Sequence, residues 1–191
     1  MVVLIHGSGP NDRDETIGPN KPFKDLALGL ATSGVGVLRY DKRTLVHGQK
    51  ILSEAEGLTV QKETIEDALL AVSLIKGMEK VDPNRIYVLG HSLGGMLVPR
   101  IGLQTNDLAG LIIVAGAARP LEDLIIDQMT YLAELDGAIS DSEKANIAEA
   151  EKLALKVKDP SLDSDTPASE LLGIPAAYWL DLQGLSTGRG C

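Results

Sequence analysis

The sequence predicts an α/β fold of three layers, with a central parallel sheet between helices, followed by a helical cap. Short apolar runs rich in β-forming residues alternate with amphipathic segments over residues 1–119, a pattern typical of parallel strands joined by crossover helices. From residue 120 to residue 183 the pattern changes to helices alone, so these residues are predicted to form a separate cap region. Residues 184–191 have no periodic pattern and are predicted to be a disordered or non-native tail.

The first region is expected to contain four strands that are covered by helices. These strands are predicted at residues 2–6, 35–39, 85–90 and 111–115. Apolar residues at helical spacing predict helices at residues 22–33, at 59–76 and directly after Ser92. By contrast, residues 45–58 show no clear period and are expected to be irregular.

The cap region is expected to begin with two helices joined by a turn. Ser140 and Glu143 fit an S-x-x-E capping box, which marks the start of the second helix. Trp179, the single tryptophan, is expected to dock onto the core or the cap. A lid over a binding site and a plain helical extension fit this pattern equally well. The helices are predicted at residues 121–135, 140–158 and 167–172.

Composition excludes several classes of function. The net charge is −9 and the pI is about 4.8, which argues against nucleic acid and anionic membranes as partners. No apolar stretch is long enough for a membrane span, and no Cys/His cluster has metal-ligand spacing, so neither a metal nor another cofactor is expected. Cys191 is the only cysteine, which rules out a disulfide within the chain.

The most informative motif is G-x-S-x-G, formed by Gly90, Ser92 and Gly94. In this motif a serine occupies a strained turn between a strand and a helix, and its hydroxyl projects above the carboxyl edge of the sheet. The glycines allow backbone segments to approach closely, and the first N–H groups of the helix lie beside the serine. A plain strand-to-helix turn is the alternative, but the flanking strand and helix favour a nucleophile at Ser92.

A second glycine-rich turn, His6-Gly7-Ser8-Gly9-Pro10, follows the first strand. Ligands of open α/β sheets bind at such carboxyl ends of strands. For His6 itself, a hydrogen-bonded structural role is expected rather than a catalytic one. Asp41 and Arg43, in the loop after the second strand, are expected to brace neighbouring loops through charged hydrogen bonds.

With H-G-S-G-P, R-Y-D-K-R and G-H-S-L-G-G after successive strands, the chain resembles the α/β-hydrolase superfamily, and most closely a bacterial carboxylesterase branch with a helical cap. The resemblance implies an α/β-hydrolase core at residues 1–119 and a small-molecule ester as substrate. It also implies that the strand at 2–6 lies between those at 35–39 and 85–90. Right-handed crossovers then place the helices at 22–33 and 59–76 on opposite faces.

The same resemblance assigns roles to individual residues. Ser92 would be the nucleophile of an acyl-enzyme mechanism, and the backbone N–H groups of Leu93 and Ser8 would form the oxyanion hole. His91 would be a neighbour of the nucleophile and not the general base. The residues that would support the two loops are His6, Gly7, Gly9, Gly90, His91 and Gly94.

The sequence departs from this family in one respect. The triad order is nucleophile, acid, histidine, but the histidines here are at positions 6, 47 and 91, so none follows Ser92. We therefore interpret the chain as a partial hydrolase that lacks the triad acid and histidine and two opening strands, with little or no activity alone. His47 acting as the base, or a second chain supplying the missing elements, are the alternatives.

Other functions of the same fold stay open at this stage. One alternative is a non-catalytic fragment or binding domain, and another is a thioesterase, lactonase, peptidase or acyltransferase. The strands at 35–39 and 111–115 would have open edges, so self-association into a homo-oligomer is expected. The cytoplasm is the default location, and export stays open because the chain begins within a strand.

Overall fold

A computed structural model describes residues 1–53 and 57–186, which fall into two compact units. Unit 1 consists of residues 1–53 and 60–118, and unit 2 consists of residues 54–59 and 119–191. Unit 1 contains the sheet and both glycine-rich turns, whereas unit 2 is helical. Within the described ranges, no helix is both long enough and apolar enough to cross a membrane.

Unit 1 is built on a parallel sheet of four strands in the order β2-β1-β3-β4. The register pairs Ile5 of β1 with Gly90 of β3, so the two strands end at the same edge of the sheet. This order confirms that the first strand lies between the second and the third. The strands are β1 (Val2–Ile5), β2 (Val37–Leu38), β3 (Tyr87–His91) and β4 (Gly110–Val114).

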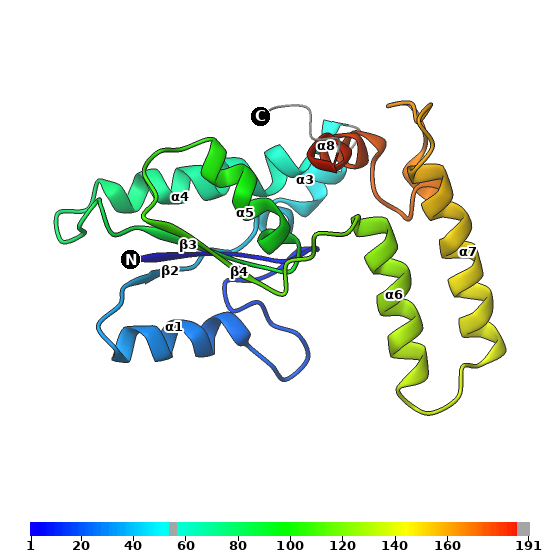
Figure 1. Cartoon of the computed structure of the whole chain (residues 1–191), viewed down its shortest axis with the longest axis horizontal. Coiled ribbons are helices and arrows are strands. Elements are labelled where there is room, and N and C mark those ends of the chain that lie inside the picture. The colour runs from blue at the N-terminus through cyan, green and yellow to red at the C-terminus, as the bar shows by residue number, and fades with distance from the viewer. Residues whose placement is uncertain (54–56, 187–191) are drawn as a thin grey trace. The chain divides into compact units, whose positions relative to one another are not determined.

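Helices cover both faces of this sheet, which confirms the three predicted layers. Helix α1 (Pro22–Thr32) lies on one face, and α4 (Glu66–Lys76) and α5 (Leu93–Leu103) lie on the other (Figure 1). A single turn of π-helix at Gln61–Ile65 leads into α4, so the helix predicted at 59–76 is present with an irregular start.

The core follows the alternation of side chains along β1. All four β1 residues are buried, and Val2 and Leu4 pack with Phe23 of α1. On the opposite face α4 contacts β1 and buries Ala68, Val72 and Ile75. Burial of each large apolar side chain contributes about 1.5–3 kcal/mol, so β1 is well anchored from both sides.

Two expectations for unit 1 are wrong. Residues 45–53 are not irregular, because α2 (Arg43–Val46) and α3 (Gly48–Ser53) cover most of them, whereas residues 54–56 of the same prediction lie outside the described residues. These helices are too short to show a clear apolar period. Strand β4 is not buried: Ile113 is 51% exposed, because helices cover the faces of this edge strand only in part.

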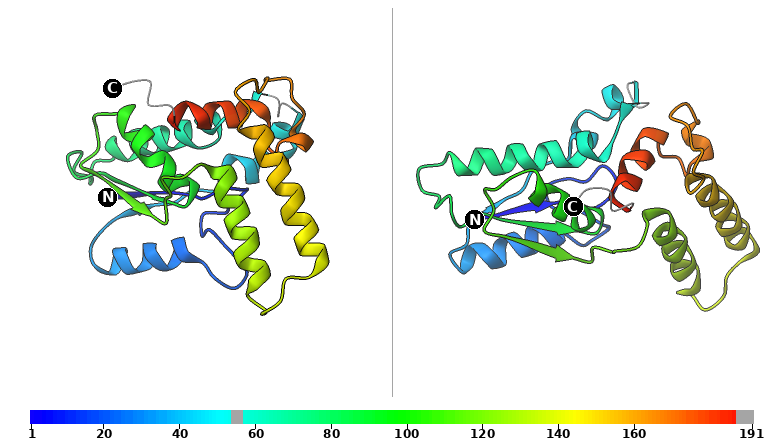
Figure 2. Two further views of the ribbon diagram at one scale, coloured as in Figure 1. Left: turned by 45° about the vertical axis from the view of Figure 1, so that its right-hand side comes forward. Right: turned by 45° about the horizontal axis from the view of Figure 1, so that its top comes forward.

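Unit 2 contains the predicted helical hairpin. Helices α6 (Leu121–Glu134) and α7 (Asp141–Val157) pack side by side (Figure 2). The capping box at Ser140 and Glu143 is present, which confirms the predicted start of α7. The predicted helix at 167–172 is a short 3-10 turn, Ala168–Glu170.

The last described element is α8 (Ala176–Ser186). The buried Trp179 belongs to it, and its indole N–H donates to the Leu171 carbonyl oxygen at 2.9 Å. Residues 184–186 are helical, whereas the sequence predicted a tail there. The rest of that prediction, residues 187–191, lies outside the described residues.

The start of α5 lies directly against the end of β1, and Gly94 makes this approach possible. A Cβ on Gly94 would lie under 3.0 Å from the carbonyl oxygens of Ile5 and His6. Backbone atoms cannot move away as a flexible side chain could. The glycine therefore fixes how closely the turn at Ser92 approaches the turn that follows β1.

We expect Gly94→Ala to lower the free energy of unfolding by about 1–3 kcal/mol, because the added methyl group would clash with the backbone at the end of β1. The matched control is Gly29→Ala in α1, where no atom lies within 4 Å of the new Cβ. That change should be neutral or stabilise by up to about 1 kcal/mol, through helix propensity. Urea unfolding followed by circular dichroism measures both. A Gly94→Ala variant as stable as the parent chain would contradict the close approach.

Candidate active site

Ser92 occupies a strained turn between β3 and α5. Its backbone has φ 53° and ψ −119°, a conformation that residues other than glycine rarely adopt and that costs on the order of 1–3 kcal/mol. The Ser92 N–H donates to the Val114 carbonyl oxygen of β4 at 2.9 Å, which ties the turn to the neighbouring strand. Position 90 requires glycine, since a Cβ there would overlap the Gly94 backbone.

The glycine-rich turn after β1 lies against this elbow. A Cβ on Gly7 would lie 3.2 Å from the Ser92 Cβ, so the two turns are in direct contact. The Asn11 side-chain amide closes the turn by donating to the carbonyl oxygens of Ser8, at 2.9 Å, and Gly9, at 3.3 Å. Gly9 has φ +87°, which explains why glycine is suited to this position.

Two backbone N–H groups at this edge are candidate donors to a ligand. Leu93 is the first residue of α5, where helical N–H groups lack a partner within the helix. In the described part of the chain, no hydrogen bond from the Ser8 N–H is present. The arrangement thus provides two potential donors, on either side of the contact between Gly7 and Ser92.

Glu15 connects the two turns and was missed by sequence reasoning. Its carboxylate is buried, one oxygen accepts the Gly7 N–H at 2.7 Å, and the other lies 3.0 Å from the His91 Nδ1. The sequence could not single out Glu15, because an acidic residue after a glycine-rich turn is also common in ordinary solvated loops.

Lys42 is the second buried charged residue that the sequence did not reveal. Its side chain is 2% exposed, and its ammonium donates to the Gly7 carbonyl oxygen at 2.9 Å. The same ammonium lies 3.2 Å from the Glu63 carboxylate. Burial lowers the pKa of Lys42, while the charge of Glu63 opposes that change. Contacts between residues so distant in sequence leave no local pattern to detect.

His6 has the surroundings of a neutral structural histidine. It is 1% exposed, and its ring packs against Phe23 and Tyr40, with centroid separations of 5.1 Å and 5.3 Å. Burial lowers the pKa of His6 to about 4, and the nearby charge of Lys42 acts in the same direction. The imidazole is therefore neutral at pH 7, as in a structural histidine. The expected hydrogen bonding is present only in part, because the buried Nε2 has no partner among the described residues.

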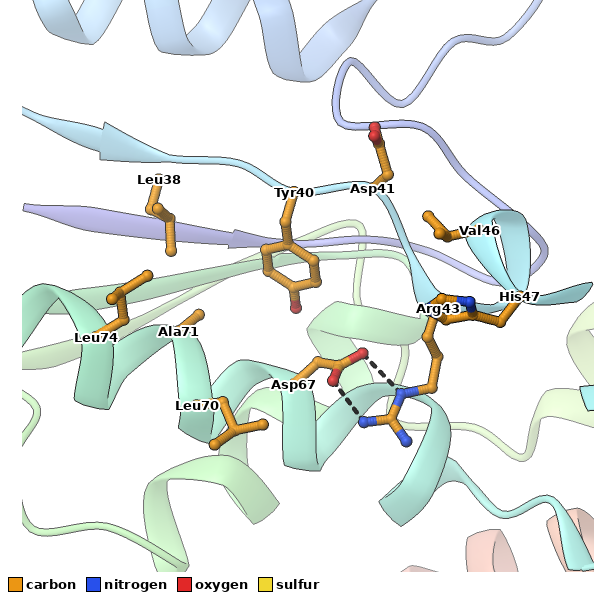
Figure 3. Close-up of a pocket in the computed structure, with 10 residues that line it drawn as sticks. All are labelled: Leu38, Tyr40, Asp41, Arg43, Val46, His47, Asp67, Leu70, Ala71 and Leu74. Carbon is orange, nitrogen blue, oxygen red and sulfur yellow. Dashed lines mark hydrogen bonds and ion pairs between the residues drawn. The ribbon is translucent and has the colours of Figure 1, made fainter.

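Asp41 and Arg43 brace loops, as predicted. The Asp41 carboxylate accepts from the Arg13 backbone N–H at 2.8 Å and pairs with its guanidinium at 2.6 Å, which lowers the pKa of Asp41 to about 2. Arg43 forms two hydrogen bonds with Asp67 of α4 (Figure 3). Both pairs hold the loop after β2 in place beside the glycine-rich turn.

His47 lies in a different environment from Ser92. It is exposed and lines a surface cavity of about 370 Å³ (Figure 3). Neither Ser92 nor any residue of the glycine-rich turn after β1 is among the described residues that line this cavity. The described residues that line the cavity are Leu38, Tyr40, Asp41, Arg43, Val46, His47, Asp67, Leu70, Ala71 and Leu74.

No group of His, Cys, Asp and Glu side chains suited to hold a metal ion is present among the residues that the structure describes. The polar groups beside Ser92 are backbone amides together with the Glu15 and His91 side chains. Of these groups, the backbone N–H donors suit a reaction in which negative charge develops on an oxygen atom near the serine.

Comparison with known proteins shows the family of this chain. The sequence profile of the alpha/beta hydrolase family matches residues 2–186. The chain belongs to this family. A solved structure of the alpha/beta hydrolase GrgF from Penicillium sp. sh18 superposes with a TM-score of 0.51 at 18% identity, over 95% of this chain and 63% of that one. This likeness supports the fold alone.

Two curated relatives are similar in sequence. Esterase EstD of Thermotoga maritima is 49% identical over 182 residues, which is 95% of this chain and 40% of that protein. The quorum-quenching protein AidA of Acinetobacter baumannii is 28% identical over 116 residues, 59% of this chain and 34% of that protein. The alpha/beta hydrolase chain described here thus spans less than half the length of either relative.

The low pKa of His6 predicts a pH dependence of stability. Between pH 6.5 and about 4 the unfolded chain binds the proton and the folded chain does not, so stability should fall as the pH is lowered through this window. The full loss from this one group is about 3 kcal/mol. His6→Gln should remove this part of the slope, which denaturant unfolding at several pH values will show. The control is His47→Gln, which replaces an exposed histidine; an unchanged slope in His6→Gln would contradict the prediction.

Proposed function

We propose that this alpha/beta hydrolase chain carries the nucleophile and oxyanion hole of a serine carboxylesterase. The observation that supports this most is the direct contact between the turn at Gly7 and the strained turn at Ser92. Ser92 is the proposed nucleophile, and the N–H groups of Ser8 and Leu93 are the proposed oxyanion donors. Gly7, Gly90 and Gly94 allow the turns to approach, and Gly9 supplies the positive φ of the first turn. His6 and His91 support both turns.

In the proposed reaction, the Ser92 Oγ forms a bond to the carbonyl carbon of a small ester and gives its proton to a base. The carbonyl electron pair moves onto oxygen, where the Ser8 and Leu93 N–H groups stabilise the charge. The intermediate collapses, the bond to the alcohol oxygen breaks, and the alcohol leaves with a proton. Water then cleaves the acyl-serine ester in the same way and restores the hydroxyl.

The base is the part of this mechanism that we assign to no residue here. None of the three histidines follows Ser92 in the sequence, and His47 lines a cavity whose described residues do not include Ser92. A serine hydroxyl without a base is a weak nucleophile. We therefore propose that the 191-residue chain alone turns over esters slowly, even though the nucleophile and donors are in place.

The relative from Thermotoga maritima supports ester hydrolysis, because a protein named an esterase is 49% identical over 95% of this chain. We propose a small-molecule ester as substrate and the helical residues 120–183 as the cap of the core at 1–119. We also propose that the chain self-associates through open sheet edges, since β2 and β4 are the outer strands of the described sheet.

Hydrolysis of p-nitrophenyl acetate by the purified chain tests this function. We expect slow turnover, on the order of 10⁴ to 10⁶ below that of a complete triad, and its loss in Ser92→Ala. Ser73→Ala, at an exposed position of α4, is the matched control and should keep the parental rate. Turnover that persists in Ser92→Ala would contradict the nucleophile and favour a non-catalytic domain. Fast turnover abolished by His47→Ala would identify His47 as the base.

A further inference from the structure

The Gly7–Ser8 peptide group has a buried cation on its carbonyl oxygen and a proposed oxyanion donor on its nitrogen. Lys42 donates to the Gly7 oxygen at 2.9 Å, and the Ser8 N–H belongs to that same peptide group. In the described part of the chain this N–H has no hydrogen-bond acceptor. The lysine and the N–H are therefore joined by a single amide.

Amide resonance couples the two ends of this peptide group. A positive charge at the carbonyl oxygen draws electron density away from the nitrogen, which makes the attached N–H a stronger donor. Hydrogen bonds in such a chain strengthen one another, most of all where water is excluded. Lys42 is 2% exposed, so its charge acts on the amide with little solvent screening.

Three contacts hold the lysine and the turn together. The Lys42 backbone N–H donates to the Asn11 carbonyl oxygen at 3.0 Å, which fixes the loop that closes the turn. Glu63 pairs with the ammonium at 3.2 Å and compensates for its burial. On the other side of Gly7, Glu15 accepts the Gly7 N–H at 2.7 Å, so neither flanking amide is free to rotate.

We propose that Lys42 is a positioning residue of the oxyanion hole, which fixes the Gly7–Ser8 peptide and polarises the Ser8 N–H toward the developing oxyanion. This role rests on the proposed function, because it requires that the Ser8 N–H is an oxyanion donor. This role distinguishes the buried Lys42 from its neighbours Asp41 and Arg43, which brace loops through ion pairs that are partly exposed.

The charge on Lys42 makes the proposal testable by titration. Its pKa is lowered by burial, so the ammonium loses its proton as the pH rises into the alkaline range, and the polarisation of Ser8 should fall with it. The groups that face Lys42 are the carboxylates of Glu63 and Glu15, which favour the charged form, and His6, which is neutral above pH about 4. In Glu63→Gln the alkaline transition should therefore move to lower pH.

The experiment follows the Ser8 amide in ¹⁵N-labelled protein by NMR, together with the rate at which diethyl p-nitrophenyl phosphate labels Ser92. Lys42→Met should move the Ser8 amide proton upfield and slow labelling on the order of tenfold or more. Lys42→Arg should restore both at neutral pH and abolish the alkaline transition, because arginine stays charged. Lys76→Met, which removes a surface lysine paired with Asp107, is the matched control and should change neither.

The readouts separate this proposal from the function on which it rests. An unchanged Ser8 amide in folded Lys42→Met, or an alkaline transition that persists in Lys42→Arg, would overturn the role of Lys42 even if Ser92 reacts normally. If the amide responds as expected but Ser92 is labelled in no variant, the proposed function fails and the catalytic role of Lys42 fails with it. Should Lys42→Met not fold because the buried Glu63 loses its ion pair with Lys42, the double variant Lys42→Met/Glu63→Gln provides the same comparison.

Discussion

The parallel pairing of β1 with β3 is the constraint on which the rest of unit 1 depends. It brings the turns that follow the two strands to the same edge of the sheet, with Ile5 beside Gly90. Gly94 then lets the start of α5 approach the backbone of β1, and Gly7 lets its own turn approach Ser92. Strain at Ser92 persists because packing on both sides over-determines the turn. Four buried residues of β1 supply the anchoring energy.

Buried charge is the second feature of this edge, and it explains how a glycine-rich turn can be rigid. Glycine supplies close approach but no side-chain contacts, so the turn must be fixed from outside. Glu15 and Lys42 do this through the two sides of Gly7, each with an oppositely charged or polar partner at His91 and Glu63. A buried ion pair contributes little net stability, but it penalises every arrangement in which one partner is left alone.

Sequence reasoning predicted what local patterns encode. The strand positions, the helices on both faces of the sheet, the strained turn at Ser92 and the capping box at Ser140 all follow from periodicity and motif chemistry. Glu15, Lys42 and Glu63 were missed because their contacts join distant loops. The exposure of β4 was missed for a different reason, because an apolar run predicts a strand without telling how far helices cover its two faces.

A crystal structure of the chain after phosphonylation by a short alkyl p-nitrophenyl phosphonate would test the central claim most directly. The tetrahedral phosphorus resembles the intermediate of ester hydrolysis, and its oxygen reports where an oxyanion would lie. The account predicts a covalent bond from the Ser92 Oγ to phosphorus, with one phosphonyl oxygen about 2.7–3.2 Å from both the Ser8 and the Leu93 nitrogen. An adduct on another residue, or an adduct on Ser92 whose oxygens face away from both nitrogens, would contradict it.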